Sequence, residues 1–495
     1  MMRVFSFAIY FFMVGLSAPI GAQIPSEEPH DQEAAKAVAQ AYDNLFSQDE
    51  AFDEALGGSA YNAIFYDLEG VEPEQITEDQ RQMAIKHVEG KLDRLSDIAT
   101  APRVDWGRKE DFEKKGFAAL IPSVGPIRRL ALEASWYAGE TWETDPQKAL
   151  ASLRHAQAAA RHVGQDTPSL ITTLTQISSE SILLNKLAEL GPQMNEQQMA
   201  SALAGIEGLP VTGSLADAIR TERDLMIGWF RNKIEGDLKA WERSASGTSD
   251  FRFPEDLRLA GVVLLPKSPV RLSLHNTRGG QTFWLEEGKE VNGIRIERVE
   301  HHPPRAWITY GNRRAIVNLE KETIQNRRVP WEVLISAFGS LNGNEIGDLS
   351  DAEKEKIQEQ LIEFGLSPDT ALDSLDRLEA FYTGAIQRLH LPLDKFEAWE
   401  EDYMDEAGEN TFLSSMAPSL SRVIEVNRAF QEKYEALETG FAIQSGGLNP
   451  ESMDENFTFK RNKNGFTITP KQFVGHPREH DYSLHFGTPP PEPDE

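Results

Sequence analysis

Two groups of histidines have the side chains that bind metal ions. His301-His302 is an adjacent pair between two expected strands, and a second group near the C-terminus comprises His476, His480 and His485. Adjacent histidines in a turn seldom point at one ion, and no pair of carboxylates lies at ligand spacing beside them. The second group lies in a polar terminal segment, which is common without a bound ion. We therefore predict no metal site and no cofactor.

One acidic segment places carboxylates beside an aromatic side chain, as glycosidases do. Trp399-Glu400-Glu401-Asp402 has these side chains, but a glycosidase needs two carboxylates about 5–9 Å apart across a bound sugar. Consecutive acidic residues on one helix are more typical of a solvated face. The chain has no cysteine and none of the hydrolase, metalloprotease, P-loop or dinucleotide-binding motifs. These residues predict no catalytic site.

The strongest functional signal is a basic stretch in an acidic chain. Residues 267–328 contain twelve Lys or Arg against seven Asp or Glu, a net charge of +5 in a chain whose formal net charge is −29. The candidate binding surface consists of the residues in or beside the strands expected there: Arg295, Arg298, Arg305, Trp307, Arg313 and Arg314. Two interpretations are open. Either this face docks on acidic helices of the same chain, or it is an exposed docking surface for an acidic protein partner.

The N-terminus has the organisation of a secretory signal peptide. Arg3 precedes an apolar run from Val4 to Leu16, and small residues lead to Ala22, after which the chain becomes polar. An apolar run this short is typical of a signal peptide and not of a membrane span. We expect cleavage after Ala22 and a periplasmic or secreted protein; the alternative is an uncleaved N-terminal segment that anchors the chain. The absence of cysteine excludes a lipid anchor on an N-terminal Cys, and the negative charge disfavours nucleic acid as a partner.

Most of the chain has the periodicity of amphipathic helices. Thr77 and Gln80 form a capping box ahead of an apolar stripe, and Ser350 with Glu353 forms a second one. Between Gln147 and Leu209, alanine-rich segments predict helices that approach one another closely. These patterns predict an antiparallel helical array on both sides of a segment with a different period.

That segment lies between residues 270 and 319. Apolar and polar residues alternate in five short runs, and turn residues such as Gly279-Gly280 and Asn292-Gly293 separate them. This spacing predicts five antiparallel strands in a small sandwich or open barrel. Two further runs around Asn464-Gly465 predict a β-hairpin, and the chain from Pro470 onward is expected to be a tail.

The predicted fold class is therefore mainly α, with an inserted small antiparallel β module and a C-terminal β-hairpin. The predicted organisation is a signal peptide (1–22), an N-terminal helical domain (23–250), the β module (251–329), a C-terminal helical region that packs with the first (330–445), and the hairpin with a disordered Pro-rich, acidic tail (446–495).

Part of the β module resembles a known family. From Phe283 to Ile296 the chain reads as a strand, a turn with Gly288 and Gly293 at its ends, and a second strand, and the likeness continues to Leu319. These residues resemble the periplasmic homology-region domain of type II secretion protein C and of the type IV pilus assembly lipoprotein P. The resemblance covers residues 270–319, about 50 of the 495 residues, and implies a small β sandwich or barrel that binds an outer-membrane secretin. The flanking helices are similar to large exported bacterial helical proteins of unknown function.

These features predict a non-enzymatic adaptor or scaffold of the cell envelope, related to secretion or pili by resemblance, that binds a protein partner through its β module. The alternative is a hydrolase that acts on envelope polysaccharide or peptide through a carboxylate-lined helical cleft, and a ligand-binding receptor is a third hypothesis. Carboxylates that converge from different helices in a deep pocket would favour the hydrolase, and an exposed sheet edge beside the arginines would favour the adaptor.

Overall fold

The computed structural model describes most of the chain between residues 29 and 487. The described ranges are 29–65, 76–107, 124–165, 168–245, 253–254, 256–263, 270–277, 281–301, 304–311, 313–318, 323–326, 329–341, 349–368, 370–407, 412, 417–463, 465–476 and 478–487. The predicted signal peptide, residues 1–22, lies outside them. Within these ranges, every helix is too short or too polar to span a bilayer.

The helices of the N-terminal part pack around a first apolar core. They are α2 (Pro29–Phe46), α3 (Asp49–Leu56), α4 (Gly58–Phe65), α5 (Glu78–Ala99), α7 (Val124–Thr141), α8 (Pro146–Val163), α9 (Leu170–Leu190) and α10 (Glu196–Glu207). The helix α7 packs against both α8 and α9. Buried alanines of α8, among them Ala149, Ala156 and Ala159, leave room for this close approach. The predicted Thr77/Gln80 capping box is present at the start of α5.

A second apolar core lies among helices from both sides of the β module. They are α11 (Leu215–Thr221), the π-helical segment η4 (Glu222–Ile227), α12 (Gly228–Ala245), α13 (Trp331–Leu341), α14 (Asp351–Glu363), α15 (Ala371–Arg388) and α16 (Leu393–Ala407). The helix α18 (Leu420–Gln444) joins the two cores, because its Val423 belongs to the second and its Leu437 to the first. The cores thus divide the chain differently from the predicted ranges 23–250 and 330–445. Helices α11 and α12 bury their apolar faces among the later helices.

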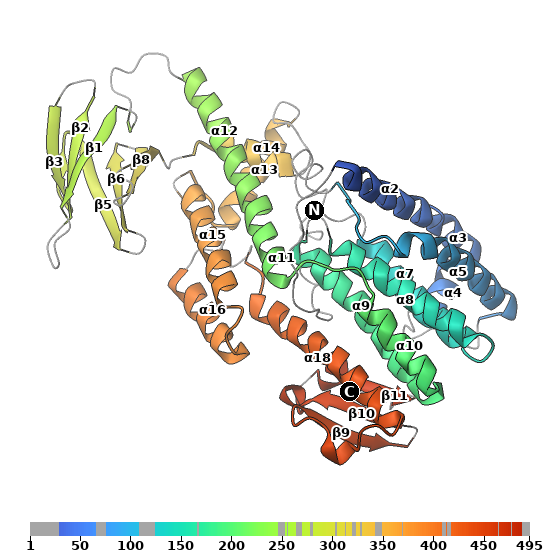
Figure 1. The fold of residues 1–495 in the computed structure, drawn as a ribbon. Helices are drawn as coiled ribbons and strands as arrows, with labels where there is room; N and C mark the ends of the chain where they lie inside the picture. Colours follow the sequence, from blue (N-terminus) through green and yellow to red (C-terminus); the bar gives the residue numbers. More distant parts are fainter. Residues whose placement is uncertain are drawn as a thin grey trace.

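The β module is a sandwich of two antiparallel sheets that share one apolar core. We call β1 (Leu257–Val263), β2 (Arg271–Asn276) and β3 (Gln281–Glu286) the far sheet. We call β4 (Glu290–Val291), β5 (Ile294–His301), β6 (Pro304–Tyr310), β7 (Arg313–Asn318) and β8 (Thr323–Asn326) the near sheet, because it faces α12 and α15 (Figure 1). The sequence does not predict β1, in which only Arg258 interrupts the apolar residues, or the short strands β4 and β8.

The C-terminal part of the chain forms a third sheet. The predicted hairpin is confirmed as β9 (Phe457–Asn462) and β10 (Gly465–Pro470). The tail predicted from Pro470 onward is wrong up to Gly487, because β11 (Leu484–Gly487) adds a third strand after the short helix α19 (Glu479–Tyr482). The aromatic ring of Phe486 is buried against Gly440 of α18, where any Cβ would lie 1.9 Å from that ring. Residues 488–495 of the predicted tail lie outside the described residues.

The predicted fold class is confirmed: the protein is mainly α-helical, with an inserted antiparallel β module and a C-terminal hairpin that is part of a small sheet. Figure 1 shows the β sandwich and the C-terminal sheet at separate ends of the helical body. The sandwich extends from the second core, and its far sheet is the part most distant from the helices.

Candidate functional site

The predicted binding residues lie on the near sheet, and its register decides which way each one points. Ile294 and Ile296 are buried in the sandwich core, so Arg295 between them points outward and is exposed. A β-bulge lies between Ile296 and Arg298, and it pairs Arg298 with Trp307 on the outward side. The alternation and the bulge together place these two arginines on the same face as Trp307.

Trp307 lies on the outer face of the near sheet, and its side chain is fully buried. Three guanidinium groups cover its ring, with centroid distances of 4.3 Å from Arg314, 4.6 Å from Arg298 and 5.8 Å from Arg305. Each such cation–π contact stabilises by about 0.5–2 kcal/mol, the more so when water is excluded. Trp307 is therefore the centre of a packed cluster and does not contact solvent.

Two of these arginines pair with acidic side chains of the helical body. Arg305 lies 3.4 Å from both Asp373 and Asp376 of α15, and Arg298 lies 3.3 Å from Asp373. We call these four residues the arginine–aspartate joint. Arg305 also binds Glu300 on the neighbouring strand; burial raises the pKa of Glu300, but the hydrogen bond and charge of Arg305 outweigh it, so the pKa is lowered. For Arg298 and Arg305 the structure therefore supports the interpretation of an internal contact.

The remaining predicted residues differ in their environment. Arg314 pairs with Glu297 at 2.9 Å on the outer face of the near sheet, and its side chain is only 16% exposed. Its neighbour Arg313 points to the other side, is exposed, and donates a hydrogen bond to the carbonyl of Phe253. Only Arg314 of these two neighbours therefore shares the face of Arg295. A single exposed surface made of all five arginines does not form.

The far sheet presents a second outward face, which the sequence pattern does not single out. Its centre is Trp284 on β3, whose side chain is 55% exposed and which pairs with Ser273 on β2. Beside it, Arg271 is 56% exposed and pairs with Glu286 at 3.0 Å, and Arg258 on β1 is exposed. We call these five residues the Trp284 face. The apolar residues that alternate with these five on the same strands point into the sandwich core. The Trp284 face therefore points away from the helical body.

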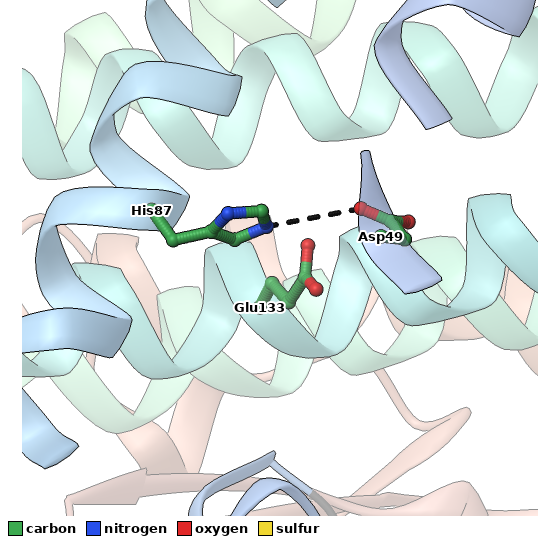
Figure 2. Close-up of side chains that lie close together, drawn as sticks. All are labelled: Asp49, His87 and Glu133. Atoms are coloured by element: carbon green, nitrogen blue, oxygen red, sulfur yellow. Dashed lines mark ion pairs between the residues drawn. The ribbon is translucent and has the colours of Figure 1, made fainter. Parts of the chain in front are cut away.

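A buried cluster of charged residues lies in the first helical core. Figure 2 shows Asp49 of α3, His87 of α5 and Glu133 of α7 converging from three helices. The Nζ atom of Lys91 lies 2.8 Å from a carboxylate oxygen of Asp49 and 2.8 Å from one of Glu133, and Arg129 donates to Glu133 at 2.8 Å. Lys91 and Glu133 are fully buried. Asp53 of α3 binds Arg129 and extends the cluster. Each of the three helices then supplies two members four residues apart: Asp49 and Asp53 from α3, His87 and Lys91 from α5, and Arg129 and Glu133 from α7.

The three potential ligands of the cluster raise the question of a metal site. Their ligand atoms lie within 4.8 Å of one another. A divalent ion at ordinary ligand distance from both carboxylates would lie about 3 Å from the Lys91 ammonium, a repulsion of roughly 10 kcal/mol at an effective dielectric constant of about 20. The ammonium of Lys91 already supplies the positive charge that the carboxylates need. We therefore assign the cluster to the packing of α3, α5 and α7.

The contacts of the buried charged cluster also bear on the hydrolase hypothesis. Carboxylates do converge from different helices, as the hydrolase hypothesis requires. Glu133 is fully buried, however, and Lys91, Arg129 and the Tyr61 hydroxyl already occupy its oxygens. Burial raises the pKa of Asp49, but His87 and the charge of Lys91 outweigh it and lower the pKa. A carboxylate held ionised in this way is a poor general acid.

The histidines considered as ligands are not brought to one point. His480 and His485 do meet, with ring nitrogens 3.2 Å apart, and His485 also bonds Thr467. His476 lies instead beside Glu425 at 3.5 Å. Of the pair at 301 and 302, His302 lies outside the described residues. A hydrogen bond between His480 and His485 already accounts for their close approach.

The acidic segment on α16 has a structural role. The carboxylate of Glu400 accepts hydrogen bonds from the backbone N–H groups of Leu420 at 2.7 Å and Ser421 at 3.1 Å, and so caps the first turn of α18. The ring of Trp399 stacks on Phe381 at 5.7 Å between centroids. Both side chains thus serve the packing of the second core.

Comparison of the chain with protein-family models, with curated proteins and with solved structures found no match in any of the three.

Proposed function

We propose that this protein is a non-enzymatic adaptor of the bacterial cell envelope that binds a protein partner through its β module. The observation that carries the proposal is the different use of the two faces of the sandwich. The near sheet is fixed to α15 through the arginine–aspartate joint, whereas the Trp284 face of the far sheet points away from the helical body.

This arrangement has the physical features of a presenting module. The joint combines charge-assisted hydrogen bonds with the buried ring of Trp307, so the sandwich is held in a set orientation. An exposed tryptophan is energetically costly to leave in water and is enriched among residues that dominate protein interfaces. The resemblance of residues 270–319 to a secretin-binding domain points to the same role.

The proposal keeps the predicted role of the β module but moves the partner surface. The sequence places it on Arg295, Arg298, Arg305 and their neighbours, and in the structure part of that surface contacts α15. The surface that we propose is instead the Trp284 face. The signal peptide predicted at residues 1–22 supports a location in the periplasm or outside the cell.

The test is quantitative affinity capture from the native envelope after mild crosslinking. The wild-type protein is compared with Trp284→Ala and with Met83→Ala, a control at an exposed apolar residue of α5. We expect at least one envelope protein whose recovery falls fivefold or more with Trp284→Ala and stays unchanged with Met83→Ala. Identical sets of captured proteins for all three forms would contradict the proposal.

A further inference from the structure

We infer that the Trp284 face binds an acidic segment of a protein partner, with the tryptophan ring as the apolar contact and the surrounding arginines as the charged contacts. This inference rests on the proposed adaptor function and names the chemistry of the partner. It follows from the availability of the face, its charge and its single large apolar side chain.

The first observation is that the face is available. The far-sheet core residues Leu272, Leu274 and Leu285 are fully buried within the sandwich, so the alternating residues point outward. Arg271 and Trp284 are both more than half exposed. In Figure 1 the strands β2 and β3 lie on the side of the sandwich that is remote from α12 and α15. In the described part of the chain, nothing covers the ring of Trp284 beyond its own sheet neighbours.

The second observation is the charge of this part of the module. The Trp284 face itself carries Arg258 and Arg271 against Glu286, a net charge of +1 on a chain whose formal net charge is −29. The carboxylate of Glu286 is already held by Arg271 at 3.0 Å and by Lys289 at 2.9 Å. Arg258 is exposed and makes no ion pair with a described residue. The face is therefore a local basic surface on a strongly acidic protein.

This contrast selects for a short acidic ligand. The field of the whole chain repels extended polyanions such as nucleic acids and anionic membranes, because they interact with many charges at once. A short acidic segment of a protein contacts only the local surface, where the Debye length of about 8 Å at physiological salt screens the distant negative charge. Small residues line the strands beside the ring, since Trp284 pairs with Ser273 and Ser273 pairs with Gly261. A flat row of this kind admits an extended segment against the ring.

The test is a fluorescence-anisotropy titration of full-length mature protein against a labelled ten-residue peptide of alternating Glu and Pro. A peptide with Lys in place of Glu is the charge control. We expect saturable binding of the acidic peptide alone, which weakens as the salt concentration rises. Arg258→Glu combined with Arg271→Glu should weaken it about tenfold, and Trp284→Ala about fivefold or more.

The matched control is Arg295→Glu, a single charge reversal at an exposed arginine on the near sheet. It is compared with the equal single reversal Arg258→Glu, which should weaken binding about threefold. Arg295→Glu should change binding less than twofold, and the exposed positions should leave thermal unfolding of all variants close to that of the wild type. Absence of saturable binding, or equal weakening by Arg295→Glu, would overturn the inference. Binding of anionic vesicles or self-association that depends on Trp284 in place of peptide binding would overturn it as well. If envelope capture still depends on Trp284 in that case, the adaptor proposal stands and only the acidic chemistry is wrong.

Discussion

Replacing Lys91 by methionine tests whether the buried charge cluster holds the first helical core together. The substitution keeps the volume of the side chain and removes its ammonium, which contacts Asp49 at 2.8 and 2.9 Å and Glu133 at 2.8 Å. Removing one partner from a buried ion pair costs about 3–5 kcal/mol, because a buried charge is left without compensation. Arg129 continues to hold Glu133, so we expect the lower end of this range, about 3 kcal/mol.

The assay is urea unfolding followed by circular dichroism. Lys86→Met, at an exposed lysine of the same helix, is the control and should change the free energy of unfolding by less than about 0.5 kcal/mol. Combining Lys91→Met with Glu133→Gln should cost less than the sum of the two single changes, because the second removes a charge that the first left unpaired. If Lys91→Met and Lys86→Met unfold at the same urea concentration, the cluster contributes nothing to the core.

Substitution of Lys91 also tests whether the cluster binds an ammonium group or a metal ion. Zinc should leave the thermal unfolding of the wild type unchanged, because Lys91 occupies the position between Asp49 and Glu133. In Lys91→Ala the three potential ligands remain and the ammonium is gone, so zinc should raise the midpoint. Zinc at about 100 times its Kd would add about 2.7 kcal/mol. Stabilisation of the wild type by zinc would refute the assignment.

Three further predictions concern single buried groups. Glu222 accepts a hydrogen bond from the N–H of Leu170, and burial raises its pKa to about 7 from an ordinary value of 4.5. The protonated carboxyl of Glu222 therefore stabilises the fold fully below about pH 4.5, and this stabilisation is lost as the pH rises through 7. Glu222→Gln should remove about 3 kcal/mol of the pH dependence of the free energy of unfolding, measured by urea unfolding at a series of pH values. Burial lowers the pKa of Lys433 to about 8. The lysine is still mostly charged at pH 7, and its charge has a desolvation cost there. Lys433→Met should therefore raise the free energy of unfolding by about 1–3 kcal/mol, and a clear loss would show that the charge is well compensated. Arg305→Ala should lower thermal stability by about 1–3 kcal/mol while Arg295→Ala changes it by less than about 0.5, and equal effects would contradict the joint.

The elements with regular patterns could be predicted from the sequence. The apolar stripe through Val88, Leu92 and Leu95 is buried on α5, as its spacing implies. Alternation identified the strands of the near sheet that carry Arg295 and Trp307. These patterns work because one side of each element faces a core and the other does not.

The charged members of the first core could not be predicted in the same way. Lys91 lies on the apolar stripe of α5, where a polar residue looks like an interruption, and its partners on α3 and α7 lie about 40 residues away in the sequence. Pairs of charged residues four apart on an otherwise apolar face are the signal that could have found them. The Trp284 face could be predicted only by knowing which of the two sheets contacts the helices. That contact depends on the ion pairs of Arg305 with α15, which join residues about 70 positions apart in the sequence.

The most direct test of the adaptor proposal is site-specific photocrosslinking in living cells of the native host. A photoreactive amino acid is placed at position 284 in one variant and at position 376, in the joint, in another. We predict an intermolecular adduct with one discrete envelope protein from position 284, and only crosslinks within the chain from position 376. Intermolecular adducts from position 376 with none from position 284 would contradict the assignment of the two faces and return the partner surface to the near sheet.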